Sequence, residues 1–130
     1  MIAEDYISFE TAKLLKEKGF DDEYTNAFYD KNGNLYFIDI LSDFSEHSDN
    51  DTDIAASTLY VAMKWLREVH HLHLSIDSYP HEDNCFYWCY KVLFMDESDL
   101  CSIKKHAKAS FNSFEAAVEA AIKYCLENLI

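Results

Sequence analysis

Apolar residues recur along this chain with two periods, and the change from one to the other divides it into helices and strands. The stretch "ISFETAKLLKEKGF" has helical spacing and predicts a helix over residues 9–18. Ser8 suits the N-cap, because its hydroxyl can accept from an unpaired amide of the first turn. Gly19 and Phe20 fit a Schellman ending in which Phe20 contacts Leu15.

A hairpin is predicted next, in "YTNAFYDKNGNLYFIDIL". Aromatic and β-branched residues favour strands near 24–30 and 35–41. Asn32-Gly33 is typical of a type I′ turn with a two-residue loop. That loop would pair Phe28 with Phe37 and Tyr29 with Tyr36.

A central helix is predicted from apolar residues that repeat at spacings of four and three. The residues of this stripe are Ala55, Leu59, Ala62, Leu66 and Val69. Asp53 or Thr52 would cap the start of this helix, and nearby aspartates would suit its positive end.

Strict alternation then returns in "HLHLSIDSYP" and "CFYWCYKVLFM", which predict a second hairpin turning within residues 79–84. Leu72, Leu74 and Ile76 would share one face of the first strand. The opposite face would carry His71, His73, Ser75 and Asp77. In the second strand one face would carry Phe86, Trp88, Tyr90, Val92 and Phe94.

The last predicted helix starts in "FNSFEAAVEAA", where Asn112 and Glu115 have the spacing of a capping box. Its buried stripe would be Phe114, Ala117, Val118, Ala121, Ile122, Cys125 and Leu129. The expected order is therefore α-β-β-α-β-β-α. We expect a single α+β domain over residues 1–130, with a mainly antiparallel sheet and helices packed on one face.

Composition supports one folded domain and restricts the partners. The chain has 130 residues, of which 49% are hydrophobic and 15% aromatic, enough for a packed core. Its formal charge is -13, so direct nucleic-acid binding and an anionic membrane surface are both disfavoured. This charge either serves solubility alone or forms an acidic surface that docks on a basic partner protein. No apolar run approaches the length of a membrane span, and "MIAEDYISFE" leads us to expect no signal peptide.

The acidic run "HSDNDTDIAASTLY" resembles a calcium loop only in its first ligands, Asp49, Asp51 and Asp53. An EF-hand that starts at Asp49 needs glycine where Ile54 stands and a bidentate glutamate where Tyr60 stands. We therefore expect calcium affinity no better than about millimolar.

The best metal candidate is His71-x-His73, because two histidines on one strand face can reach the same zinc ion. A third ligand would have to come from near His81 or from a distant loop. The alternative is that these histidines only form the polar face of a half-buried strand. The four cysteines form no CxxC pair and are expected to be reduced. The chain has two glycines and contains neither a Walker loop nor a GxGxxG motif, and we expect no cofactor and no enzymatic activity.

Three segments carry a resemblance to a known group of proteins. "YISFETAKLLKEKGF", "AMKWLREVHHLHLSI" and "SFEAAVEAAIKYCLENL" resemble an uncharacterised family of small proteins from phages and prophage-like elements of gut Bacteroidales bacteria. The resemblance does not cover the acidic run or residues 95–110. It implies a mobile-element origin and a place in the cytoplasm of the bacterial host, and it carries over no functional residue.

Three functions remain open from the sequence. The first is a small non-enzymatic accessory protein that acts through contacts with another protein. The second is an acidic inhibitor that imitates a nucleic acid and occupies the basic groove of a host defence protein. Its surface would be Asp43, Glu46, Asp49, Asp51 and Asp53, within acidic clusters at 21–23, 43–53 and 96–99. The third is a zinc-binding protein or enzyme that uses His71 and His73.

Overall fold

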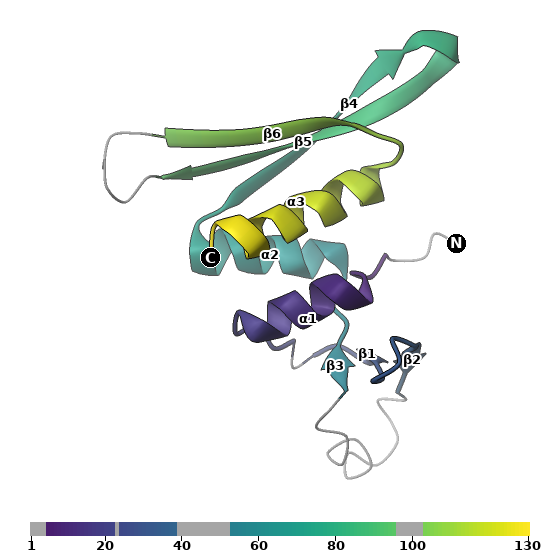
Figure 1. The fold of residues 1–130 in the computed structure, drawn as a ribbon, viewed down its shortest axis with the longest axis vertical. Helices are drawn as coiled ribbons and strands as arrows, with labels where there is room; N and C mark the ends of the chain where they lie inside the picture. The colour runs from purple at the N-terminus through teal and green to yellow at the C-terminus, as the bar shows by residue number, and fades with distance from the viewer. Residues whose placement is uncertain (1–4, 23, 39–52, 96–102) are drawn as a thin grey trace. The chain divides into compact units, whose positions relative to one another are not determined.

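The fold comes from a computed structural model, which describes residues 5–22, 24–38, 53–95 and 103–130. The chain divides into two compact units, Met1–Thr58 and Leu59–Ile130, and each is described by itself (Figure 1). The expectation of a single domain stays a prediction, because compact units can unfold together or separately.

The fold is mixed α+β with antiparallel sheets, as predicted. The elements are α1 (Phe9–Glu17), β1 (Ala27–Tyr29), β2 (Leu35–Phe37), β3 (Ile54–Ala55), α2 (Leu59–His70), β4 (His73–His81), the 3₁₀ turn η2 (Glu82–Asn84), β5 (Cys85–Met95), β6 (Ile103–Phe111) and α3 (Phe114–Asn128). Two strands, β3 and β6, add to the predicted order, and the strands form two three-stranded sheets, β2-β1-β3 and β4-β5-β6.

Helix α1 of the first unit begins and ends as its sequence indicates. The hydroxyl of Ser8 accepts from the amide of Thr11 at 3.3 Å. At the other end, Phe20 N donates to Leu15 O at 2.9 Å and Gly19 N donates to Lys16 O at 3.1 Å. Gly19 has a φ of 93°. These are the two hydrogen bonds of a Schellman motif, which is confirmed.

The β1–β2 hairpin forms, but its register differs by one residue from the prediction. Phe28 pairs with Tyr36, and Tyr29 pairs with Leu35. The turn is the reason: Gly33 N donates to Asp30 O, and of its central residues only Gly33 has positive φ. This is a type I turn followed by a left-handed glycine, which makes a three-residue loop. The predicted type I′ turn is therefore wrong, as are both predicted pairs.

The predicted start of the central helix is also wrong. Ile54 and Ala55 form β3, which pairs with β1 through Phe28↔Ala55 and Tyr29↔Ile54. Helix α2 starts only at Leu59, so neither Asp53 nor Thr52 can cap it and Ala55 lies outside its stripe. Leu59, Ala62 and Leu66 are buried as expected, whereas Val69 is 55% exposed.

The second unit contains the β4-β5-β6 sheet. The β4–β5 hairpin has the predicted position, with partners from His73↔Leu93 to His81↔Cys85. Strand β6 was not predicted. It pairs with β5 from Met95↔Ile103 to Trp88↔Phe111, with a bulge between Trp88 and Tyr90.

Helices α2 and α3 lie on one face of this sheet, as predicted (Figure 1). The buried residues of the unit alternate along the strands and repeat with helical period along α3. They are Leu59, Ala62, Leu66, Leu72, Tyr90, Val92, Ala117, Val118, Ala121, Ile122, Cys125 and Leu126. At the tip of the hairpin Phe86 is 60% exposed, so the predicted apolar face of β5 is buried only in its middle.

The start of α3 is shifted by one residue from the predicted capping box. Ser113, and not Asn112, is the N-cap, and its hydroxyl accepts from Ala116 N at 3.0 Å. Ser8 and Ser113 therefore start their helices with the same chemistry. Over the described ranges, none of the helices has the length and apolar character that crossing a bilayer requires.

Candidate functional site

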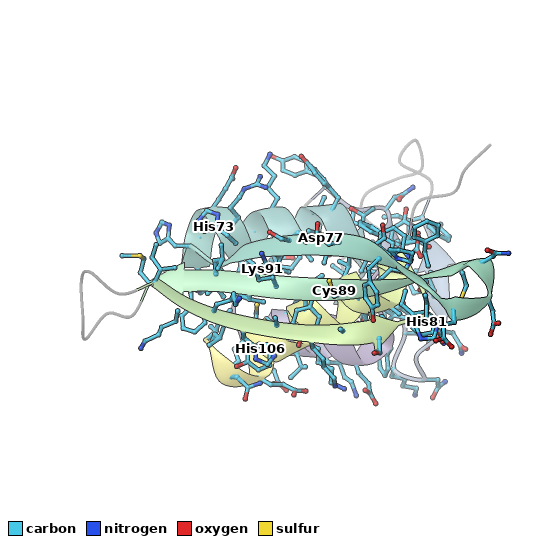
Figure 2. All side chains as sticks on the ribbon, turned by 90° about the horizontal axis from the view of Figure 1, so that it is seen from above. His73, Asp77, His81, Cys89, Lys91 and His106 are labelled. Carbon is cyan, nitrogen blue, oxygen red and sulfur yellow. The ribbon has the colours of Figure 1, made fainter. Side chains whose placement is uncertain are left out.

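The sheet face that points away from α2 and α3 is accessible and chemically mixed; we call it the outer face. Because Tyr90 and Val92 point into the core, the residues of β5 that alternate with them, such as Cys89, Lys91 and Leu93, point outward. Strand pairing places these residues in rows: His73–Leu93–Lys105, Ser75–Lys91–Ala107, Asp77–Cys89 and Tyr79–Tyr87. Figure 2 looks down on this face, with His73, Asp77, Cys89 and Lys91 labelled along it.

Three rings form a ladder near the hairpin tip of the outer face. The ring centroids of His81 and Tyr87 are 4.2 Å apart and stacked, and those of Tyr87 and Tyr79 are 6.3 Å apart and perpendicular. Ser110 N donates to the hydroxyl of Tyr79 at 3.1 Å, so the Tyr79 side chain reaches from β4 to β6. Ser110 has a φ of 75° at the bulge, which turns its amide toward this ring. The Tyr79 end of the ladder is thus tethered to the bulge.

The predicted zinc pair is not assembled on one strand face. His71 has a φ of 57° and lies between α2 and β4, so the strand alternation that was to align it with His73 starts only after it. His81 lies toward the other end of β4 from His73 (Figure 2). In the ranges that the structure describes, no group of three or more His, Cys, Asp or Glu side chains could hold a metal ion.

A second cluster lies on the inner side, where β6 meets α3. The His106 and Tyr124 rings stack at 3.6 Å with an angle of 6°, and the Tyr90 hydroxyl lies 3.0 Å from His106 Nε2. Burial raises the pKa of Tyr90, and burial also raises the pKa of the Cys125 thiol to about 12. Cys125 is therefore a neutral core residue at physiological pH and not a thiolate nucleophile. Sequence reasoning missed this cluster because it missed β6.

Strand β6 is the most basic stretch of the chain. Its sequence "IKKHAKASF" holds three of the eleven Lys and Arg residues and no acidic residue. Lysine, alanine and serine are not strong strand formers, so propensity conceals this strand. The signal that remains is lysine itself, which natural proteins place on edge strands to prevent uncontrolled pairing.

Acidic residues are concentrated in the first unit. Met1–Thr58 holds fourteen Asp and Glu against four Lys and Arg, whereas Leu59–Ile130 holds ten against seven. Of the predicted acidic surface, Asp43, Glu46, Asp49 and Asp51 lie outside the described residues. Asp53 is described, and its carboxylate accepts a hydrogen bond from the hydroxyl of Tyr36. The weak calcium affinity expected of Asp49, Asp51 and Asp53 stays a prediction.

Asp53 also borders a cavity of about 350 Å³ in the first unit. Lys16, Asp21, Phe20 and Phe28 contribute to its wall. The volume falls within the range of small-ligand pockets. Charges of both signs beside two aromatic rings suit a ligand or partner side chain that has polar and apolar parts.

Comparison with known proteins adds no relative. No family model matches the chain, and neither the curated proteins nor the solved structures contain a significant match. The resemblance to small Bacteroidales phage proteins therefore stays a hypothesis from the sequence.

Proposed function

We propose that this chain is a small non-enzymatic accessory protein that binds another protein through the outer face of its β4-β5-β6 sheet. The mobile-element setting of this proposal comes from the sequence resemblance alone. The observation that carries it is the ring ladder of Tyr79, Tyr87 and His81, held on an accessible sheet face by the bond from Ser110 N to the Tyr79 hydroxyl.

Such a ladder has the properties of a binding anchor. Tyrosine is enriched at protein interfaces, because a large ring contributes contact area while few torsions must be ordered. Tyr79 is already tethered at its hydroxyl, so it loses less freedom when a partner covers it. His73, Lys91 and Lys105 lie along the same face and would form a polar rim. A binding role requires no catalytic group, and the high thiol pKa of Cys125 excludes that residue as a nucleophile.

The alternative for this face is a merely solvated sheet surface, and site-specific photo-crosslinking separates the two. A photoreactive phenylalanine analogue would replace Tyr87 on the outer face in one protein and Tyr60 in another. Tyr60 is 67% exposed on α2, matches Tyr87 in ring size and is more exposed than the half-buried Tyr87, so exposure alone cannot favour labelling from position 87. Both proteins would be irradiated in lysate of a gut Bacteroidales bacterium, the host that the resemblance implies.

We expect an adduct of defined mass from position 87 and none from position 60. Adding Tyr79→Ala should reduce the yield, because the ladder loses its tether. Equal labelling from the two positions, or no adduct from position 87, would contradict a binding role for the outer face.

A second candidate is the acidic inhibitor of a nucleic-acid-binding protein. It is favoured by the excess of ten acidic residues over basic ones in Met1–Thr58. Carboxylates in such density can imitate phosphates toward Arg and Lys side chains. The engagement of Asp53 with Tyr36 weakens the contribution of that one residue to a solvated acidic surface.

A further inference from the structure

The β4-β5-β6 sheet has two edges. In the described part of the chain, β4 and β6 each pair only with β5. An edge strand exposes backbone N–H and C=O groups that another extended segment can pair with. Figure 1 shows β6 running along the side of this sheet.

The two edges are interrupted at different places. Pro80 interrupts the donors of β4, since proline has no N–H, and Asp83 and Asn84 turn the chain with positive φ directly after it. Strand β6 contains neither proline nor glycine. Its pairing with β5 is regular from Ile103 to Lys108, and the bulge at Ser110 marks the end of this stretch. Residues 103–108 therefore form an uninterrupted edge of six residues, against seven, residues 73–79, in β4 before Pro80, so length does not choose between the two edges.

Charge decides what this edge can accept. Lys105 and Lys108 are exposed, and Lys108 lies over the Phe111 ring at 6.0 Å. A second copy of β6 would bring like charges into opposition, which destabilises strand pairs, and an apolar strand would have to desolvate the lysines. The lysines therefore disfavour the addition of most strands at this edge. An acidic strand is the exception, because its carboxylates would pair with the lysines across the new ladder.

We infer that the β6 edge is a docking site for an acidic, extended segment of the partner protein, which adds to the sheet as a fourth strand. This inference rests on the proposed protein-binding function and names the chemistry of the partner. Backbone hydrogen bonds supply affinity in such strand addition, and side-chain pairing at alternate positions supplies specificity. Lys108 faces the α3 side and Lys105 the outer face, and both are exposed, so carboxylates on either face of the segment find a lysine.

The test uses the full chain, labelled with ¹⁵N, and synthetic peptides of about eight residues, the length of an ordinary strand. The probe peptide alternates glutamate and valine. One control replaces glutamate by lysine. Another keeps the glutamates but methylates alternate backbone nitrogens, which retains the charge and removes strand pairing. A single-stranded oligonucleotide of equal charge tests whether any polyanion suffices.

We expect the glutamate peptide to shift the amide resonances of residues 103–108 and to protect them from hydrogen exchange, while the lysine and methylated peptides do neither. A Lys105→Glu/Lys108→Glu variant should bind the glutamate peptide about tenfold more weakly, because like charges then oppose each other. Lys64→Glu/Lys123→Glu on the helices is the matched control and should bind as the wild type does.

Equal binding of the methylated peptide or the oligonucleotide would overturn the inference in favour of nonspecific anion binding. Absence of shifts with the glutamate peptide, or shifts confined to other strands, would overturn it as well. A crosslink from position 87 without any shift of β6 resonances would reject the edge site and support the proposed binding function of the outer face. Strand addition at β6 without that crosslink would instead reject the outer face as the binding surface.

Discussion

The hydroxyl of Tyr36 donates a hydrogen bond to the carboxylate of Asp53, and this bond passes over the central strand of the first unit. Tyr36 lies on β2, Asp53 directly precedes β3, and β1 runs between the two strands. Phe28 of β1 stacks on the Tyr36 ring at 6.0 Å. The bond therefore ties together three segments that are far apart in the sequence.

This bond predicts a loss of stability at high pH. Burial, the hydrogen bond to Asp53 and the charge of Asp53 raise the pKa of Tyr36 from its ordinary 10.0 to about 12. A raised pKa means that the folded state holds the proton more tightly than the unfolded state does, so this stabilisation is full below pH 10 and is lost as the pH rises toward 12. Thermal unfolding between pH 9 and 12 should show a smaller decline for Tyr36→Phe than for the wild type. Identical declines would show that the bond does not form.

Leu66 and Val69 form a matched pair on α2 that separates core from surface. Leu66 is fully buried, whereas Val69 is 55% exposed, although periodicity placed both in one stripe. Leu66→Ala should lower the free energy of unfolding by about 2–5 kcal/mol, because it leaves a cavity. Val69→Ala and His73→Ala should each change it by less than about 0.5 kcal/mol. Urea unfolding measures all three; comparable losses at Leu66 and Val69 would contradict the face assignment.

The start of α3 can be tested with Ser113 and Asn112. The Ser113 hydroxyl accepts from Ala116 N at 3.0 Å, so Ser113→Ala should cost about 1 kcal/mol of unfolding free energy. Asn112→Ala should stay within about 0.5 kcal/mol, since Asn112 is exposed and precedes the cap. A larger loss of stability for Asn112→Ala than for Ser113→Ala in chemical denaturation would instead support the predicted capping box of Asn112 with Glu115.

Gly19 and Gly33 test how packing adds to backbone strain. Both have positive φ, at 93° and 83°. A Cβ at Gly19 would meet nothing within 4 Å, whereas one at Gly33 would lie 3.1 Å from the Phe9 ring. Gly19→Ala should cost about 1 kcal/mol from strain alone, and Gly33→Ala should cost more because the ring must also shift. Equal costs in urea unfolding would indicate that Phe9 moves freely.

The acidic-surface alternative predicts salt-sensitive binding. Replacing Asp43, Glu46, Asp49 and Asp51 by their amides should chiefly slow association with a basic partner, because peripheral charges steer encounter. Asp53 is left unchanged so that its bond with Tyr36 persists. Binding should weaken steeply with salt, since exposed charges are screened over about 8 Å at physiological ionic strength. Surface-plasmon measurements in which the four-amide variant and wild type capture the partner equally at low and high salt would contradict the mimicry.

Elements whose causes lie within a few residues could be predicted from the sequence. Ser8 starts α1 and Gly19 with Phe20 ends it through local hydrogen bonds. The alternation of β4 and β5 also predicted their hairpin, because a turn joins neighbouring strands. In α3, periodicity found most of the buried face, including Ala117, Val118 and Cys125. It failed at the two ends of the helix, because Phe114 is 40% exposed and Leu129 is only half-buried.

Tertiary pairing decided the rest. Asp53, Ile54 and Ala55 suit a helix start by local chemistry. Pairing with β1 nevertheless makes Ile54–Ala55 a strand, and the Asp53 carboxylate accepts a hydrogen bond from Tyr36 instead of capping a helix. Strand β6 likewise exists because β5 offers a row of hydrogen-bonding partners, although its lysines and alanines favour no strand. Differences in propensity are worth less than about 1 kcal/mol per ordinary residue, so a ladder formed with a distant segment outweighs them. The candidate edge and the ring ladder both depend on β6, and for that reason only the tertiary structure reveals them.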